Sequence, residues 1–249
     1  LLGQEPGWMA ENALRAIELG SKGVDVNFGC PAKMVNRSNG GAVMLQYPEQ
    51  LYNVVKAMRD AVPSEHPVTA KIRLGFNDKS LYMENALAIY EAGASELAVH
   101  ARSKVDGYKP PAYWEYITDI NNKLPIPVIA NGEIWNYQDG QDCIGATGVD
   151  SLMVCRGAFN IPNLGNVVKH NHQKMPWDKV IELLLRYSEF QIKGDKGMYY
   201  PNRVKQWFVY LSKGYPEANE LFKEIRTFKK APPIVERLQR YQEEYHQPV

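Results

Sequence analysis

Short apolar runs alternate with longer amphipathic stretches along the chain as far as Val154. The runs are rich in Val, Ile, Leu and Ala and show little internal alternation, which is typical of buried parallel strands. We predict five strands, at 24–27, 68–73, 97–100, 128–131 and 151–154. Apolar residues at helical spacing predict five helices, at 7–19, 48–61, 81–92, 112–122 and 137–144. Turns containing Gly or Pro follow the helices, so we expect repeated strand–helix units around a parallel sheet.

Polar residues gather where each predicted strand ends. They are Asn27 and Cys30, Lys71 and Arg73, His100 and Arg102, Asn131 and Glu133, and Arg156. A closed (β/α)8 barrel collects its chemistry from the ends of many strands on one face, whereas an open sheet concentrates it at one switch point. The pattern therefore favours an α/β fold of the TIM-barrel class.

A complete barrel has eight strands, and we find five in this sequence. The chain opens on Leu1-Leu2-Gly3-Gln4, without an initiator Met and with an apolar pair typical of the end of a strand. We therefore expect that N-terminal strands of the barrel, about three of them, are missing from this chain.

The periodicity changes beyond Pro176. Amphipathic helical stretches follow one another without strands between them, at 177–193, 200–212, 217–229 and 233–245. Such a succession predicts a small all-α helical bundle. With the boundary placed in the segment 171–176, we predict a partial barrel over residues 1–173 and a helical domain over residues 174–249.

Composition places the chain among ordinary globular proteins, with 45% apolar and 23% charged residues. The sequence has neither an apolar run of about 18 residues nor a signal-peptide pattern, so we expect no membrane partner. Its three cysteines are too few for a disulfide framework and fit a reducing, cytoplasmic compartment. Because no long heptad pattern argues for a dimer, a monomer is expected.

Charge is distributed unevenly behind the net charge of +1. From His172 onward there are 14 Lys and Arg against 10 Asp and Glu, whereas the preceding residues have 15 against 18. A basic C-terminal part can contact a polyanion, although solvated helix faces produce such an excess as well.

Cys30 lies three residues beyond a predicted strand, and the glycine-rich run 39–42 follows it. A thiol on a loop at the mouth of a barrel can donate or accept a proton. Glycines allow the backbone to approach a flat ligand closely. The alternative is a small residue that packs the turn. Cys143, on an apolar helical face, is predicted to belong to the core.

Lys71 and Arg73 alternate with Ile72 on one predicted strand, so both point to the same face. A lysine inside a barrel is costly unless it meets an anion, an electron-rich ring or a carboxylate. We favour a functional Lys71; the alternative is a structural ion pair with Glu133. A Schiff-base aldolase would also use such a lysine, and borohydride trapping with a carbonyl substrate would detect it.

His100 and Arg102 repeat this geometry on the next predicted strand. His100 can donate to a carbonyl or a phosphate, or it can be a satisfied interior histidine. Tyr108 lies in the following loop, where it can cover a ligand.

Asn131-Gly132-Glu133 and Arg156-Gly157 end the last two predicted strands. Counted as strands seven and eight of a barrel, these are positions where barrels commonly bind phosphate through loop amides and a short helix. The pattern predicts a phosphate-bearing cofactor, with tight glycine turns as the alternative.

In the C-terminal part, Arg203, Lys205 and other basic residues are interleaved with aromatic residues such as Tyr199. This mixture suits contact with RNA phosphates and bases. Trp207 and Phe222, however, are expected to belong to the core of the bundle.

These motifs occur in the order and spacing of tRNA-dihydrouridine synthases, and the chain resembles that family over essentially its whole length. The resemblance is carried by residues 27–31 with 40–42, 71–75, 100–102, 131–134 and 156–158. Details around Trp135, Trp177 and Trp207 are similar to the bacterial C-type branch, which implies the uridine at position sixteen of the tRNA D-loop.

The resemblance implies a flavin-bearing TIM barrel with a helical tRNA-binding domain. NADPH would reduce FMN, and a flipped-out uracil would receive hydride at C6. In this scheme Cys30 protonates C5 and Asn27 binds the uracil edge. The implied cofactor-binding residues are Lys71, His100, Asn131, Gly132, Glu133, Arg156 and Gly157. On the substrate side we expect Arg102, Tyr108, Arg203 and Lys205, and we expect no metal.

Two features depart from the family pattern. Cys155 occupies the position of a usual glycine before Arg156, where a side chain can crowd the phosphate loop. The family's N-terminal strand with its Ala-Pro-Met flavin turn is absent, so this chain by itself is expected to bind FMN poorly. The competing functions are a catalytically silent tRNA-binding protein and another FMN barrel acting on a free pyrimidine; the helical tail argues against the second.

Overall fold

The computed structural model describes residues 1–190 and 197–245. It consists of two compact units. The first contains residues 1–134 and 138–153, and the second contains residues 135–137 and the described residues from 154 onward. The first unit is built on a parallel sheet and the second is helical.

The sheet of the first unit has its strands in chain order: β1 (Val24–Asn27), β2 (Val68–Arg73), β3 (Leu97–His100), β4 (Val128–Asn131) and β5 (Ser151–Met153). All four pairings are parallel. The helices of this series are α1 (Pro6–Glu18), α3 (Pro48–Ala61), α4 (Tyr82–Glu91), α5 (Trp114–Lys123) and α6 (Tyr137–Thr147). The predicted strands and helices of this region are thus confirmed, with bounds shifted by at most a few residues.

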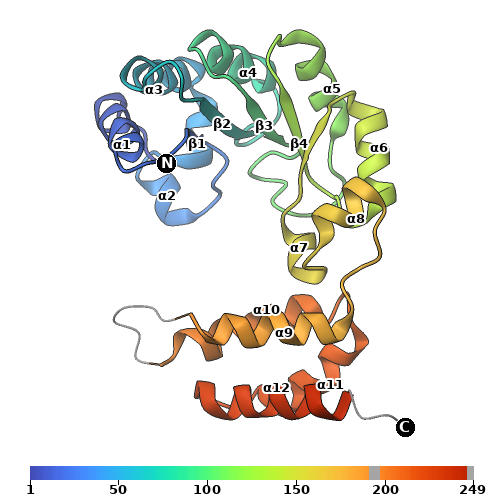
Figure 1. Ribbon diagram of the computed structural model, residues 1–249. Coiled ribbons are helices and arrows are strands. Elements are labelled where there is room, and N and C mark those ends of the chain that lie inside the picture. Colours follow the sequence, from blue (N-terminus) through green and yellow to red (C-terminus); the bar gives the residue numbers. More distant parts are fainter. Residues whose placement is uncertain (191–196, 246–249) are drawn as a thin grey trace. The chain divides into compact units, whose positions relative to one another are not determined.

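Helices cover one face of the sheet. Figure 1 shows α3, α4, α5 and α6 on the outer side of the strands, and α1, α3, α4 and α5 each pack against the next. In a doubly wound sheet helices cover both faces, whereas in a barrel they form a single outer layer. Sequential parallel strands with helices on one side are the wall of a (β/α)8 barrel, so the predicted fold class is confirmed.

The two faces of the sheet differ in chemistry because side chains alternate along each strand. Apolar residues from each strand face the helices and are almost fully buried, as Val26, Ile72 and Val99 are. Each such side chain stabilises the fold by about 1.5–3 kcal/mol. Lys71 and Asn131 lie on the other face, in the register set by the strand pairing. The packing that holds the sheet therefore also selects the face that carries polar groups.

Four short helical segments were not predicted: α2 (Lys33–Arg37), η1 (Gly41–Gln46), α7 (Arg156–Asn160) and α8 (Leu164–His170). None is long enough to show a helical period against its surroundings. The first two follow β1 in the first unit, and the other two open the second unit.

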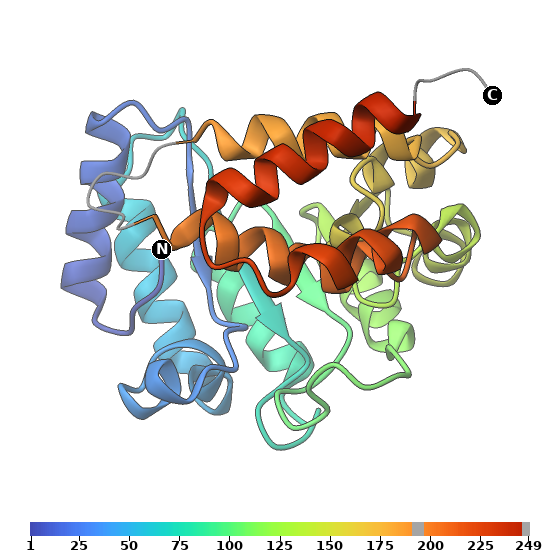
Figure 2. The ribbon, with the colours of Figure 1, turned by 90° about the horizontal axis from the view of Figure 1, so that it is seen from below.

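The second unit continues with α9 (Trp177–Ser188), α10 (Tyr199–Leu211), α11 (Pro216–Ile225) and α12 (Ala231–Tyr245). This succession of helices confirms the predicted bundle; residues 191–193 of the first predicted helix lie outside the described residues. Figure 2 shows α12 alongside α9, and the two helices are in contact. The division between the units falls near Val154, whereas the predicted functional boundary at 173–174 stays a prediction.

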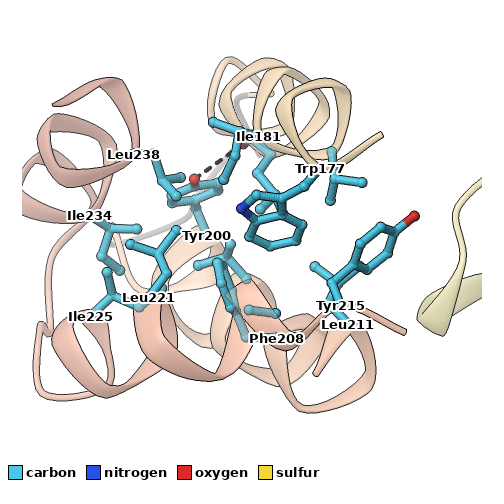
Figure 3. Close-up of a cluster of buried hydrophobic side chains, with 14 residues drawn as sticks. Trp177, Ile181, Tyr200, Phe208, Leu211, Tyr215, Leu221, Ile225, Ile234 and Leu238 are labelled. Atoms are coloured by element: carbon cyan, nitrogen blue, oxygen red, sulfur yellow. Dashed lines mark hydrogen bonds between the residues drawn. The ribbon is translucent and has the colours of Figure 1, made fainter. Parts of the chain in front are cut away.

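Aliphatic and aromatic residues together fill the core of the bundle (Figure 3). The ring of Trp177 meets that of Phe208 edge-on at 6.3 Å between centroids and that of Tyr215 at 5.2 Å. The Tyr200 hydroxyl donates to the carbonyl oxygen of Leu184 at 3.2 Å, which satisfies a polar atom inside this core. Partly buried Phe222 packs against the cluster, in agreement with its predicted place.

Replacing Phe208 by Ala is expected to lower the free energy of unfolding by about 3–5 kcal/mol, because it removes a fully buried ring and leaves a cavity. Urea denaturation followed by circular dichroism measures the change. The neighbouring Val209 is 52% exposed, and Val209→Ala is the control, with an expected change of about 0.5 kcal/mol or less. Equal losses in the two variants would contradict the place of Phe208 in the core.

Candidate active site

The backbone of the loop after β1 holds Cys30 in place. The Cys30 carbonyl oxygen accepts hydrogen bonds from the Ala42 N–H and from Nδ2 of Asn36, both at 3.0 Å. Oδ1 of Asn36 accepts a hydrogen bond from the Val43 N–H at 2.8 Å. One amide side chain thus links the two ends of the loop, at Cys30 and at Val43. Gly41 has a φ of +68°, and a Cβ there would lie 2.8 Å from the Cys30 oxygen. Cys30 as a residue is half-buried.

Asn27 ends β1 beside Lys71, its register partner on β2. Its Oδ1 accepts a hydrogen bond from the Gly29 N–H at 2.9 Å, which shapes the turn that leads to Cys30. The structure therefore brings Asn27, Lys71 and the Cys30 loop to the same end of the sheet, as predicted.

Lys71 and Asn131 meet across β3. The Lys71 Nζ donates to Oδ1 of Asn131 at 3.2 Å, and Nδ2 of Asn131 donates to the carbonyl oxygen of Met153 at 2.7 Å. Their strands, β2 and β4, alternate in the sheet, and alternate strands contribute side chains to the same layer inside a barrel. Because Nδ2 has to face a carbonyl, Oδ1 has to face the ammonium. The Asn131 amide thus orients the Lys71 side chain.

Arg102 and Glu133 form an ion pair of 2.7 Å between Nη2 and Oε1. Arg102 is 0% exposed, and its Nε also donates to the carbonyl oxygens of Lys109 and Pro111. Removing one partner of such a pair would leave an uncompensated buried charge. The contact of Arg102 with substrate stays a prediction, since in this structure its guanidinium binds the loop after β3.

His100 packs against a glycine that has a constrained backbone. Gly132 has a φ of +128°, and a Cβ there would lie 3.2 Å from Cδ2 of His100 and 3.4 Å from Cβ of Ala112. Nε2 of the buried histidine lies 3.4 Å from Nη1 of Arg102. A guanidinium N–H can only donate, so this contact favours the tautomer with the proton on Nδ1. Glu133 follows with a φ of +56°, and the ion pair with Arg102 holds it there.

Tyr108 lies near the ends of β2 and β3, and its covering role stays a prediction. Its ring is 5.1 Å from the guanidinium carbon of Arg73 and 6.1 Å from the ring of His100, measured between centroids in the second case. Burial lowers the pKa of Arg73, and Tyr108 opposes that shift. The tyrosine itself is 51% exposed.

Asp106 stiffens the loop that carries Tyr108. Its Oδ2 accepts from the Ser103 N–H at 2.8 Å and pairs with Nζ of Lys79 at 3.0 Å, while its own N–H donates to Oγ of Ser103 at 3.2 Å. Burial acts to raise the pKa of Asp106, but the bonds from Ser103 and Lys79 outweigh it and hold the pKa below the ordinary value of 3.8.

Four of the predicted site residues belong to the second unit. Arg156 begins α7 with its guanidinium carbon 5.1 Å from the Trp135 ring centroid, and the next residue, Gly157, is buried. On α10, Arg203 is exposed and its Nη1 donates to Oε1 of Gln206 at 3.0 Å. The Lys205 Nζ donates to the carbonyl oxygen of Phe228 at 2.9 Å, a structural contact between α10 and the segment before α12.

Comparison with known proteins gives the family. The family model for dihydrouridine synthase (Dus) matches residues 1–245. This chain belongs to the dihydrouridine synthase family. It is 66% identical over 245 residues to the tRNA-dihydrouridine(16) synthase of Vibrio parahaemolyticus, covering 98% of this chain and 76% of that protein. The protein of the same name from Escherichia coli K12 is 51% identical over 240 residues, covering 96% of this chain and 76% of that protein.

A solved structure supports the fold of this dihydrouridine synthase. A 2-naphthoyl-CoA reductase in complex with 2-naphthoyl-CoA has a TM-score of 0.52 and 16% sequence identity, covering 66% of this chain and 28% of that chain. At this identity the likeness concerns the fold alone.

Among the residues that the structure describes, no helix has both the length and the apolar character needed to cross a membrane.

The sequence did not predict two residues of this site, Asp106 and Asn36. Asp106 had a usable signal, because Ser103 precedes it by three positions, the spacing of a reciprocal capping pair. Asn36 had none, because its partners are the backbone groups of Cys30 and Val43. Cys143 is fully buried on α6, as predicted.

Replacing Asp106 by Asn is expected to destabilise the dihydrouridine synthase by about 1–2 kcal/mol at neutral pH, because charge-assisted hydrogen bonds are lost. The folded-state pKa is the lower one, so this stabilisation is complete above the unfolded-state pKa and disappears as pH falls through the folded-state pKa. The difference between wild type and variant should be constant from about pH 8 to pH 5 and shrink below about pH 4.

Urea denaturation across that pH range measures the difference. Asp150→Asn, at an exposed position, is the control and should change the free energy of unfolding by about 0.5 kcal/mol or less. A loss of stability in Asp106→Asn that stays the same below pH 4 would contradict the role of the charged carboxylate.

Proposed function

We propose that this chain reduces a uridine of tRNA to 5,6-dihydrouridine, using FMN as its flavin and NADPH as the reductant, and that the uridine is the one at position 16. The observation that carries this proposal is the match to relatives named tRNA-dihydrouridine(16) synthase, at up to 66% identity. Half-buried Lys71, the register partner of Asn27 on the strand that leads into the Cys30 loop, supports it with suitable chemistry.

The polar face of the first unit suits a flavin. Lys71 supplies a cation that Asn131 orients at 3.2 Å, and this cation would stabilise negative charge on a bound, reduced flavin ring. Gly132 leaves room that a side chain would fill beside His100. These donors fit an electron-rich, flat ring. Asn131, Gly132 and Glu133, with Arg156 and Gly157, are assigned together to the ribityl chain and the phosphate.

When bound, the flavin supplies a hydride to C6 of the uracil. Cys30 donates its thiol proton to C5, so the C5=C6 double bond is replaced by two new C–H bonds. The thiolate then regains a proton from solvent. Because Ala42 and Asn36 hold the Cys30 backbone, the proton is delivered from a defined position, which is the condition for efficient general-acid catalysis.

The base has to leave its stack to reach this site. Asn27 is assigned to the uracil edge, and Tyr108, which is half exposed near the strand ends, is assigned to cover the base, with Arg102 as a further contact. In the bundle, Arg203 and Lys205 are assigned to the tRNA. Residues 1–173 then form the catalytic domain and residues 174–249 the tRNA-binding domain.

The test uses two purified proteins: these 249 residues, for which weak flavin binding is expected, and the same residues joined to the part of the Vibrio parahaemolyticus relative that this chain does not cover. For the joined protein the expected results are visible flavin absorbance and dihydrouridine at position 16 of unmodified tRNA, located by mass spectrometry of nuclease fragments. Colourless protein that binds tRNA and forms no product would instead support a silent tRNA-binding protein. Product at another uridine would contradict the assignment to position 16.

Replacing Cys30 by Ala is expected to preserve NADPH oxidation and to lower dihydrouridine formation by at least about 100-fold, because general-acid catalysis is lost. Cys143→Ala removes a buried thiol on α6 and is the matched control, with product formation retained. If Cys30→Ala forms dihydrouridine at the wild-type rate, Cys30 is not the acid.

A further inference from the structure

Arg73 connects two loops at the end of the sheet. Its Nε donates to the carbonyl oxygen of Gly29 at 2.9 Å, and its Nη1 donates to the carbonyl oxygens of Ser103 and Gly107 at 3.1 and 2.9 Å. The side chain is only 2% exposed. A buried guanidinium has to find acceptors for its N–H groups, and here the acceptors are backbone atoms of two different loops.

The bonded carbonyls lie next to the two side chains to which the proposed function gives distinct tasks. Gly29 directly precedes Cys30, and Gly107 directly precedes Tyr108. The Tyr108 ring also lies over the Arg73 guanidinium at 5.1 Å. The guanidinium of Arg73 therefore contacts the backbone just before Cys30. It also contacts the ring of Tyr108 and the backbone just before that residue.

Each of the two loops is stiff by itself. Asn36 closes the Cys30 loop through the backbone groups of Cys30 and Val43. Asp106 closes the Tyr108 loop through Ser103. The position of one stiff loop relative to the other consequently depends on the contacts between them, and the Arg73 fork supplies three such hydrogen bonds.

We propose that Arg73 is a positioning residue that couples the Cys30 loop to the Tyr108 loop and so sets the proton donor relative to the side chain that covers the base. The proposal rests on the proposed function for the tasks of Cys30 and Tyr108. The coupling itself depends only on the hydrogen bonds of Arg73.

A second arginine of the same design provides a matched control. Arg59 donates to three backbone carbonyl oxygens, those of Val62, Pro63 and His66, at 2.6 to 2.8 Å. These carbonyls lie in the loop before β2, at the N-terminal end of the strands. In barrels that end contributes to stability, whereas the C-terminal end carries the chemistry.

The experiment compares Arg73→Met with Arg59→Met through the alkylation rate of Cys30 by iodoacetamide, measured by peptide mass spectrometry. The exposed thiol of Cys155 is the internal reference for the reagent. Cys143 is fully buried, and burial raises its pKa to about 12, so it should stay unmodified. We expect the ratio of Cys30 to Cys155 alkylation to rise about fivefold or more in Arg73→Met, because a released loop opens locally, and to stay unchanged in Arg59→Met.

Steady-state kinetics with tRNA provides the second measurement. We expect kcat to fall by about 100-fold in Arg73→Met, because a displacement of about 1 Å in a reacting group has this effect. The KM for tRNA should stay within about threefold of wild type, because uniform binding is not removed. In Arg59→Met both constants should be retained. An unchanged alkylation ratio in Arg73→Met, or equal effects in the two variants, would overturn the proposal.

Arg73→Lys covers the case in which Arg73→Met does not fold. A lysine keeps the charge but lacks the planar fork, so it can hold one loop but not both. We expect intermediate values of the alkylation ratio and of kcat, and wild-type values in both would overturn the coupling. The alkylation ratio can be measured without flavin or tRNA. A wild-type protein that forms no dihydrouridine would therefore contradict the proposed function, whereas the coupling of the two loops would still be tested by the alkylation ratio.

Discussion

Burial of one face of the parallel sheet beneath its helices is the interaction on which the first unit depends. Val26, Ile72 and Val99 are fully buried on that face, and the alternation of side chains sends their neighbours to the other face. Lys71 is therefore held in a half-buried position by apolar packing that takes place behind it. A shift of one residue in strand register would exchange the two faces and place the lysine against the helices.

Arginines link the loops that this packing leaves at the strand ends. Arg73 and Arg102 are both buried, and their guanidinium groups bind mostly backbone carbonyls of the loops after β1 and β3. Such loops lack the regular hydrogen bonding of a helix or a strand, so their carbonyls need partners from elsewhere. A planar guanidinium has several donors for these carbonyls. Because its fork is preorganised, it loses less side-chain entropy for each hydrogen bond that it forms. The precision of the candidate site thus depends on arginines that hold its loops.

The sequence predicted the strands and the long helices because they carry a clear periodicity, and it placed Asn27, Lys71 and Asn131 at one end of one sheet for the same reason. It did not predict the partners of the charged groups. Arg102 pairs with Glu133, and Lys205 donates to the Phe228 carbonyl; the second of these acceptors is backbone, which carries no signature of residue type. Short segments such as α2 and α7 were missed because five residues cannot display a helical period.

The link between Lys71 and Asn131 also bears on the chemical ageing of the protein. Asn131 precedes Gly132, and an asparagine followed by glycine is prone to lose its amide through attack by the next backbone nitrogen. Oδ1 of Asn131 accepts a hydrogen bond from the Lys71 ammonium, and its Nδ2 donates to the Met153 carbonyl. The amide side chain has to rotate before the backbone nitrogen can attack it, and that rotation breaks both hydrogen bonds. A carboxylate formed there has no N–H to donate to Met153. Deamidation would thus remove the bridge between β2 and β5 irreversibly, and the same two hydrogen bonds that orient the lysine slow that loss.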